Sequence, residues 1–161
     1  MTAVLPGLLD RLMGGAQPTT GPRPGPSLEQ LKACVARDLE ALLNTRAGRP
    51  PQAFDDYPEA RASILNYGLL DFAAFSLSSS EDRAAVEASL KDAIERHEPR
   101  LRNVSATVHD NGSVNRLDFV IHATLELAGM AEAVNFDAVL QPSSLHYSIS
   151  LTQRTRRWTS T

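Results

Sequence analysis

The sequence predicts an α+β protein in which two amphipathic helices and short helical turns pack on one face of a four-stranded antiparallel meander. In the first half of the domain, apolar residues recur every three or four positions, as in helices that bury one side. After Pro99 they recur at every second position, as in strands that bury one face. Helices followed by a run of closely spaced strands favour an α+β architecture over alternating α/β units.

Length, composition and charge limit the class of protein. The chain has 161 residues, of which 42% are hydrophobic and 22% charged, which is typical of one soluble globular domain. Its net charge of −3 gives no electrostatic reason to expect nucleic-acid binding. A single cysteine excludes an intramolecular disulfide. No apolar run approaches the roughly 20 residues that span a bilayer, so direct membrane insertion is not expected.

Composition divides the chain into four regions. Residues 14–27 hold four glycines and four prolines, which predicts a linker. It joins a short apolar peptide, 1–13, to a single globular α+β domain, 28–152, and a mobile basic tail is expected over 153–161. The apolar peptide is too short to form a stable helix alone, so it either folds back or docks on another protein. Its candidate partner-binding residues are Leu5, Leu8, Leu9 and Leu12.

The first predicted helix begins after Ser27 and ends near Asn44. Ser27 followed by Gln30 is a capping-box pattern, which is typical of a helix N-terminus. An apolar stripe at helical spacing follows and predicts the buried side of this helix. The stripe consists of Leu28, Leu31, Val35, Leu39 and Leu42.

Loops and a second helix are expected next. Prolines and a glycine predict a loop over 47–60, and one or two short helical turns interrupted at Gly68 are expected over 61–75. Ser79 or Ser80 can cap the second helix. Its buried stripe is predicted to comprise Val86, Leu90 and Ile94, supported by Ala85, Ala93 and His97.

Four alternating runs after Pro99 predict four consecutive strands. Asn111-Gly112 is the strongest hairpin signal in the chain, and Gly129 and Pro142 mark two further turns. Short turns between successive strands favour an antiparallel meander whose apolar face the helices cover. The inward residues are Val104, Ala106 and Val108; Leu117, Phe119, Ile121, Ala123, Leu125 and Leu127; Val134, Phe136, Ala138 and Leu140; and Leu145, Tyr147, Ile149 and Leu151.

No metal or cofactor site is predicted. No histidine lies four positions from another, and Cys34 has no neighbouring cysteine. His122 and His146 fall on the polar side of their strands and could meet across the sheet, but a zinc site needs three or four ligands. Cys34 lies beside the apolar stripe and is interpreted as a structural thiol.

A carboxylate pair is the strongest enzymatic alternative. Glu95 or Glu98 at the end of the second helix, with Asp118 or Glu126 on the polar sheet face, could supply the acid and base of a glycoside hydrolase. A glycoside hydrolase that uses Glu98 is therefore the alternative function. Against it, 19 acidic residues in 161 make such pairs frequent by chance.

The segment Glu98-Pro99-Arg100 joins the second helix to the first strand. Pro99 lacks an N–H and disfavours helical geometry at Glu98, so it ends the helix. If the chain is extended here, Glu98 and Arg100 point to the same side. They then form either a solvated ion pair worth about 0–1 kcal/mol or a stiff pair of charges that binds a partner protein. The residues alone favour the solvated pair.

Five segments, in order along the chain, resemble TssE, the family of baseplate subunits of bacterial type VI secretion systems. They are LLDRL in the apolar peptide, RDLEALLNTR at 37–46, SILNYGLLDF at 63–72, HEPRL at 97–101 and VNFDAVL at 134–140. Leu70 departs from the family pattern, which usually has proline at this position. The TssE family is related to a small wedge protein of contractile-phage baseplates. Some relatives carry a lysozyme label, so the alternative function that the resemblance implies is a peptidoglycan-cleaving, lysozyme-like glycoside hydrolase that uses Glu98.

The resemblance implies a structural, non-catalytic role in a cytoplasmic baseplate near the inner membrane. It implies wedge partners of the TssF, TssG and TssK type and no cofactor. The family hallmark, here Glu98, Pro99 and Arg100, is linked to wedge contacts, so the resemblance favours partner binding by these residues. The resemblance implies that the sheet starts sheath assembly by accepting strands from sheath subunits. The last predicted strand, 145–151, is the expected receiving edge.

Overall fold

The structure is a computed structural model that describes residues 27–70, 72, 79–109, 116–127, 130–141, 144 and 146–152. The docking peptide, almost all of the linker, the basic tail, the hairpin signal Asn111-Gly112 and the turn residues Gly129 and Pro142 lie outside the described residues. The helices are α2 (Leu28–Leu43), α3 (Pro58–Arg61) and α4 (Ser80–His97), with 3₁₀ turns η1 (Pro51–Phe54) and η2 (Ile64–Asn66). The strands are β1 (Leu101–His109), β2 (Leu117–Leu127), β3 (Met130–Gln141) and β4 (His146–Leu151).

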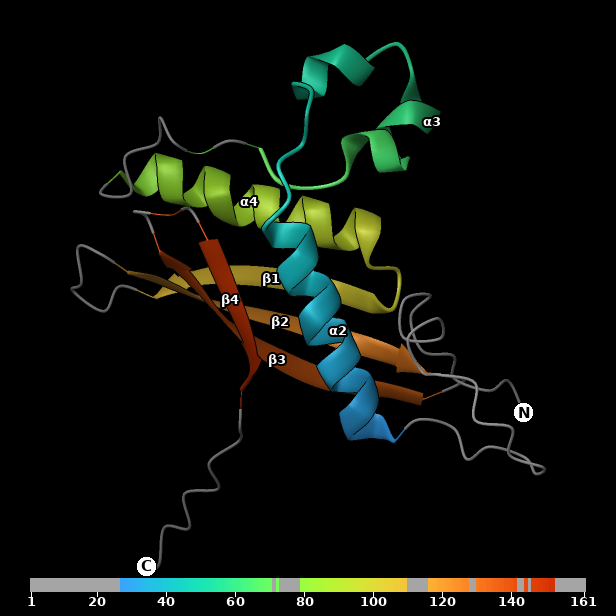
Figure 1. The fold of residues 1–161 in the computed structure, drawn as a ribbon, viewed down its shortest axis with the longest axis vertical. Helices are drawn as coiled ribbons and strands as arrows, with labels where there is room; N and C mark the ends of the chain where they lie inside the picture. The colour runs from blue at the N-terminus through green and yellow to red at the C-terminus, as the bar shows by residue number, and fades with distance from the viewer. Residues whose placement is uncertain are drawn as a thin grey trace, which may run out of the picture.

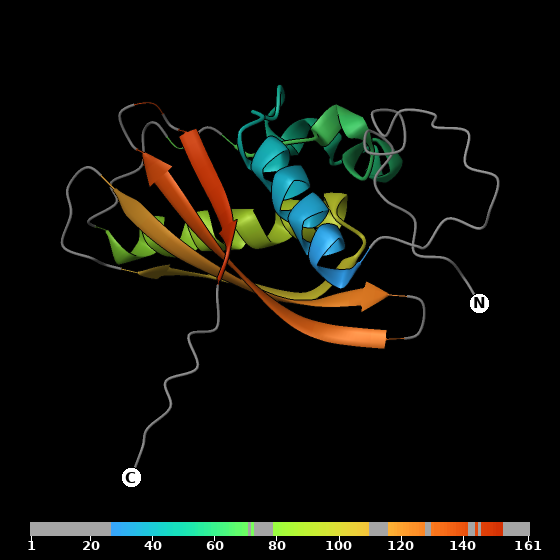
Figure 2. The ribbon, with the colours of Figure 1, turned by 60° about the horizontal axis from the view of Figure 1, so that its bottom comes forward.

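The four strands form one antiparallel sheet in the order β1-β2-β3-β4, which confirms the predicted meander. Both long helices, α2 and α4, lie on the same face of this sheet (Figures 1 and 2). The β2–β3 register runs without interruption, whereas β1 has an irregularity between Arg102 and Ser105. Asn103, inside that irregularity, has a positive φ of 52°, a conformation that asparagine tolerates better than most residues. The helices and this single antiparallel sheet together confirm the predicted α+β class.

The capping box predicted for the first helix is present. The Ser27 hydroxyl accepts a hydrogen bond from the Gln30 N–H, and the Gln30 side chain accepts one from the Ser27 N–H. The helix ends at Leu43 with Asn44 as its C-cap, as expected. The predicted stripe is buried except for its first member, because Leu28 lies in the first turn and stays 36% exposed.

Helix α4 also begins as predicted, with Ser79 as its N-cap and Glu81 and Asp82 in its first turn. Val86, Leu90, Ala93 and Ile94 are buried against the sheet. The prediction that Ala85 supports this stripe is wrong, because Ala85 faces solvent.

Alternating strand residues and the two helical stripes build one hydrophobic core. Phe119, Ile121, Leu125, Phe136 and Ala138 are all fully buried under the helices. Burial of apolar area of this kind is the main stabilising contribution, at about 25 cal/mol per Å².

The two strand histidines do not meet across the sheet, so that alternative is excluded, and both are exposed strand residues. His122 lies opposite Asn135 and bonds its side-chain oxygen at 2.8 Å, whereas His146 lies opposite Gln141. Asn135 and Gln141 are separated along β3 by about 20 Å at the usual rise of a strand.

After α2, residues 44–70 form an excursion that extends away from the sheet (Figure 1). The loop predicted over 47–60 contains η1 and α3, both of which begin with a proline at the first helical position. A short parallel bridge between Arg46 and Leu69 closes the base of this excursion. Gly68 stands at the base with φ 113°, as the predicted interruption of the helical turns requires. The His97 ring bonds the Asn66 carbonyl at 3.0 Å and fixes the excursion to the end of α4.

Side chains from α2, its C-cap and α4 form hydrogen bonds with the backbone of the two edge strands, β4 and β1. On β4, the Tyr147 N–H donates to Asn44 Oδ1 at 2.8 Å, and the Asn44 amide donates in return to the Tyr147 carbonyl. Two residues further along, the Ile149 N–H donates to Glu40 Oε2 at 2.9 Å. On β1, the Val108 N–H donates to Glu87 Oε1 at 2.7 Å. The expectation that β4 offers its outer edge to an added strand is therefore wrong at Tyr147 and Ile149.

Asn44→Ala is expected to lower the free energy of unfolding by about 1–3 kcal/mol, because it leaves the backbone of the buried Tyr147 without its bonds to α2. Thr45→Ala is the matched control, since its hydroxyl makes one exposed bond to the Ala41 carbonyl. Urea unfolding of both variants measures the difference. An Asn44→Ala loss no larger than that of Thr45→Ala would show that the edge contact is not stabilising.

Candidate functional site

The segment Glu98-Pro99-Arg100 forms a tight turn between α4 and β1. Helix α4 stops at His97, and Glu98 is its C-cap, which confirms that Pro99 ends the helix. The Leu101 N–H donates to the Glu98 carbonyl at 3.0 Å and closes the turn. The expectation of an extended chain is therefore wrong, although both charged side chains do lie on one side.

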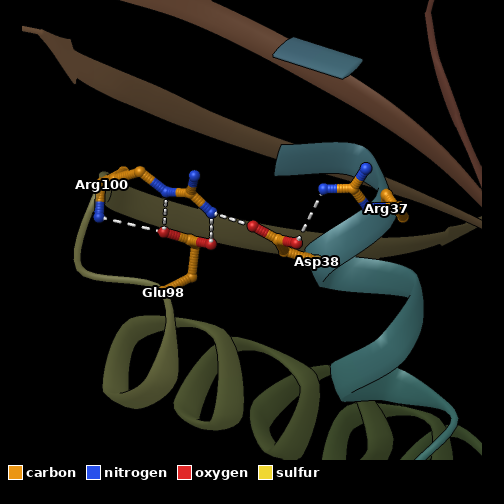
Figure 3. A network of polar contacts seen from close by, with 4 residues as sticks. All are labelled: Arg37, Asp38, Glu98 and Arg100. Atoms are coloured by element: carbon orange, nitrogen blue, oxygen red, sulfur yellow. Dashed lines mark hydrogen bonds and ion pairs between the residues drawn. The ribbon is translucent and has the colours of Figure 1, made fainter. Parts of the chain in front are cut away.

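The turn brings Glu98 and Arg100 together as a bidentate ion pair (Figure 3). Arg100 Nε donates to Glu98 Oε1 at 2.6 Å, and Arg100 Nη2 donates to Glu98 Oε2. Nη2 also donates to Asp38 Oδ2 on helix α2 at 2.6 Å, and Arg37 lies 3.7 Å from the other Asp38 oxygen. One guanidinium therefore joins the end of α4, the start of β1 and the middle of α2.

The network is largely shielded from solvent, so the predicted solvated surface pair is wrong. Glu98 is only 6% exposed, and the Arg100 side chain is 22% exposed. A carboxylate this buried is tolerated when a well-placed counter-charge and hydrogen bonds compensate for its lost hydration. The hydrogen bond to Glu98 raises the pKa of Arg100 further, so the guanidinium stays charged.

One edge of the Arg100 guanidinium remains open. Nε and Nη2 are engaged by carboxylates, whereas no described residue bonds Nη1. Nη1 points away from both carboxylates in Figure 3. Because the Glu98 and Asp38 contacts hold the planar group still, its two free N–H groups have a fixed direction, which favours bonding to a carbonyl or carboxylate of another molecule.

Asp38 is a third member of this site that the sequence pattern did not indicate directly. It lies beside the apolar stripe of α2, next to the buried Leu39, and inside the RDLEALLNTR segment that resembles the TssE family. The sequence did contain a signal for Asp38, because this carboxylate lies next to a buried position and within a segment that resembles the family.

Glu98 is paired with a guanidinium and not with either of the candidate carboxylates Asp118 and Glu126. Both Glu98 oxygens contact Arg100, whose guanidinium also donates to Asp38. Asp118 and Glu126 instead pair with Arg116 at 2.5 Å and Arg102 at 3.5 Å.

Glu95 is exposed on α4 and lines an open depression of about 500 Å³ with Asp92 and Lys91. In the described part of the chain, no group of three or more His, Cys, Asp or Glu residues could bind a metal ion. None of the described helices combines the length and apolar character needed to cross a bilayer. The candidate residues Leu5, Leu8, Leu9 and Leu12 lie outside the described residues.

Fold and site together define an α+β protein whose central polar network joins two helices to a meander sheet. Residues 29–129 match the family described as baseplate wedge protein gp25. The chain therefore belongs to the gp25 family of baseplate wedge proteins, which confirms the resemblance to baseplate subunits. A chain of the structure described as the baseplate complex from the type VI secretion system is similar, with 18% identity, 70% of this chain and 96% of that chain covered, and a TM-score of 0.47. No curated protein matches the chain.

Proposed function

We propose that the chain is a non-catalytic structural subunit of a type VI secretion baseplate, which links the wedge complex to the contractile sheath and helps to start sheath assembly. Membership of the baseplate wedge family carries this proposal. The ordered motifs that resemble TssE favour the secretion machine over a phage tail. In this role the chain works in the cytoplasm, in a baseplate near the inner membrane, with wedge proteins of the TssF, TssG and TssK type.

Arg100 is the proposed contact with a wedge protein. Its Nη1 edge is open, while Glu98 and Asp38 fix its orientation. Pro99, exposed in the same turn, lies next to it and limits the freedom of the backbone. The partner is expected to offer a backbone carbonyl or a carboxylate. The apolar peptide with Leu5, Leu8, Leu9 and Leu12 is proposed as a second contact, joined by the Gly/Pro-rich linker.

Sheath subunits are proposed to add a strand to the sheet. Asn44 and Glu40 already bond the outer edge of β4 at Tyr147 and Ile149, so the part of β3 that extends beyond β4 is the better receiving edge. An incoming strand gains backbone hydrogen bonds there without displacing the helix side chains.

Arg100→Lys is expected to keep the chain folded while it weakens co-purification with wedge proteins at least about fivefold, an effect of about 1 kcal/mol or more. Lysine retains a positive charge near Glu98 but lacks the second, open edge of the guanidinium. The measurement is quantitative mass spectrometry of proteins bound to the tagged chain in its native host. Arg102→Lys, at an exposed position of the neighbouring strand, is the control. Equal recovery of wedge proteins with wild type and Arg100→Lys would rule out the open edge as a contact.

A further inference from the structure

The turn η2 exposes two large apolar side chains and buries a polar one. Ile64 is 82% exposed and Leu65 is 65% exposed, whereas the next residue, Asn66, is only 8% exposed. This reverses the usual preference, because aliphatic side chains are among those most often buried and asparagine is mostly exposed. Tyr57, at the N-cap of the neighbouring helical turn α3, is exposed as well.

Exposed apolar side chains concentrate in the excursion. Of the five large hydrophobic side chains that are exposed in the described part of the chain, three lie within nine residues of one another. Single exposed aliphatic residues are common on protein surfaces, whereas several close together mark an interaction site. We call Tyr57, Ile64 and Leu65 the apolar excursion surface. The excursion extends away from the sheet, so a partner can approach it (Figure 1).

Hydrogen bonds hold the turn below these side chains in one conformation. The buried Asn66 side chain donates to the Arg61 carbonyl at 3.1 Å, and the Asn66 carbonyl accepts from the His97 ring at 3.0 Å. The Ser63 hydroxyl caps the turn by accepting the Leu65 N–H at 3.2 Å. Because the turn is already fixed, a partner loses little affinity to ordering it.

Unpaired carboxylates lie beside the apolar excursion surface. Asp55 and Asp56 directly precede Tyr57, Glu59 follows it by two residues, and all three carboxylates are exposed. None of them forms an ion pair with another described residue. Arg61 is the only basic residue between Asp55 and the end of η2, so negative charge predominates there. An apolar surface with a negative rim favours a partner whose apolar side chains are flanked by lysine or arginine.

We propose that the apolar excursion surface is a docking site for a segment of a wedge protein with at least two aliphatic or aromatic side chains flanked by basic residues. The inference rests on the proposed function, which supplies the wedge protein. His97 joins the excursion to the end of α4, and Glu98 and Arg100 follow in the next turn. A wedge protein bound at Arg100 therefore lies beside the base of the excursion. A second copy of this chain is disfavoured, because two such surfaces would bring unpaired carboxylates together.

Recovery of wedge proteins with the tagged full-length chain in its native host, measured by quantitative mass spectrometry, tests the contact. Ile64→Gln/Leu65→Gln is expected to lower this recovery at least about tenfold, because the partner loses two apolar contacts. Both positions are exposed, so the melting temperature is expected to change by less than about 4 °C. Ile64→Leu/Leu65→Ile keeps the apolar area and is the matched control, with recovery expected to stay within about twofold of wild type.

Asp55→Asn/Asp56→Asn tests the charge expected of the partner. Recovery of wedge proteins is expected to fall at least about twofold at low salt, and the difference from wild type is expected to shrink as salt is raised. Glu95→Gln removes an exposed carboxylate from α4 and is the control, with unchanged recovery. Equal recovery with wild type and Asp55→Asn/Asp56→Asn would overturn the basic character of the partner, and with it the inference.

A p-benzoylphenylalanine in place of Ile64 identifies the occupant by photo-crosslinking in the host. The crosslinked peptide is expected to come from a wedge protein and to carry lysine or arginine within about four residues, one helical turn, of an apolar side chain. A crosslink to a second copy of this chain or to its residues 1–13 would overturn the inference, as would full recovery of wedge proteins with Ile64→Gln/Leu65→Gln.

The inference and the proposed function can fail separately. If Arg100→Lys lowers the recovery of wedge proteins but Ile64→Gln/Leu65→Gln does not, the docking site is wrong and the proposed function stands. If the wild-type chain recovers no wedge protein, both are wrong.

Discussion

Arg100→Ala is expected to lower the free energy of unfolding by about 3 kcal/mol, the lower end of the range for breaking a buried ion pair. The substitution removes the only described counter-charge of Glu98, whose side chain is 7% exposed, and releases Asp38 from its bond to the turn before β1. The lower end applies because the Arg100 side chain is 22% exposed and water screens part of the interaction. Urea unfolding followed by circular dichroism measures the loss.

Arg102→Ala is the matched control for this effect. Arg102 lies two residues further along the chain and pairs with Glu126 at 3.5 Å, with both side chains 57% exposed, so its loss is expected to stay below about 1 kcal/mol. The double variant Glu98→Leu/Arg100→Met is expected to recover much of the stability, because no unpaired charge remains buried. Equal losses for Arg100→Ala and Arg102→Ala would contradict a structural role for the network.

Gly68→Ala is expected to lower the free energy of unfolding by about 2–4 kcal/mol. Gly68 has φ 113°, and a Cβ at this position would lie 2.5 Å from the Thr45 carbonyl oxygen. That carbonyl accepts the Leu69 N–H at the base of the excursion, so it cannot move away without loss of a hydrogen bond. The melting temperature and the urea midpoint report the change.

Gly48→Ala separates this local strain from the general effect of replacing glycine. A Cβ at Gly48 has no atom within 4 Å and no unusual φ, so the variant is expected to be neutral or to gain about 0.4–1 kcal/mol from a less flexible unfolded chain. If Gly68→Ala were as stable as Gly48→Ala, the backbone at Thr45 and Gly68 would be able to move apart at no cost, which would contradict the expected strain.

The helices, the strands and their order could be predicted because periodicity in the sequence reflects burial. The stripe of α2 and the alternation in β2 and β3 each record which side of an element faces the core. Capping at Ser27 and Ser79 is local chemistry within three residues and is equally visible in the sequence. The family was likewise indicated by the residues themselves, because five short segments resemble it in the right order.

Contacts between residues far apart in the sequence could not be predicted. Asp38 and Arg100 are separated by 62 positions, and Glu40 and Ile149 by 109, so no periodicity links them. Without Asp38 and the packing of α2, Glu98 and Arg100 resemble an ordinary surface pair. Of the short helical turns, η2 falls within the predicted range 61–75. The turns η1 and α3 were missed for a different reason, since prolines such as Pro51 and Pro58 indicate a loop as readily as the first position of a short helix.

Electron cryomicroscopy of the assembled baseplate from the native host tests most directly whether Arg100 is a wedge contact. We expect the Glu98–Arg100–Asp38 network to be retained in the assembly, with Arg100 Nη1 within about 3 Å of a carbonyl or carboxylate oxygen of a wedge protein. An Arg100 side chain that faced solvent in the assembly, or a baseplate that lacked this chain, would contradict that role.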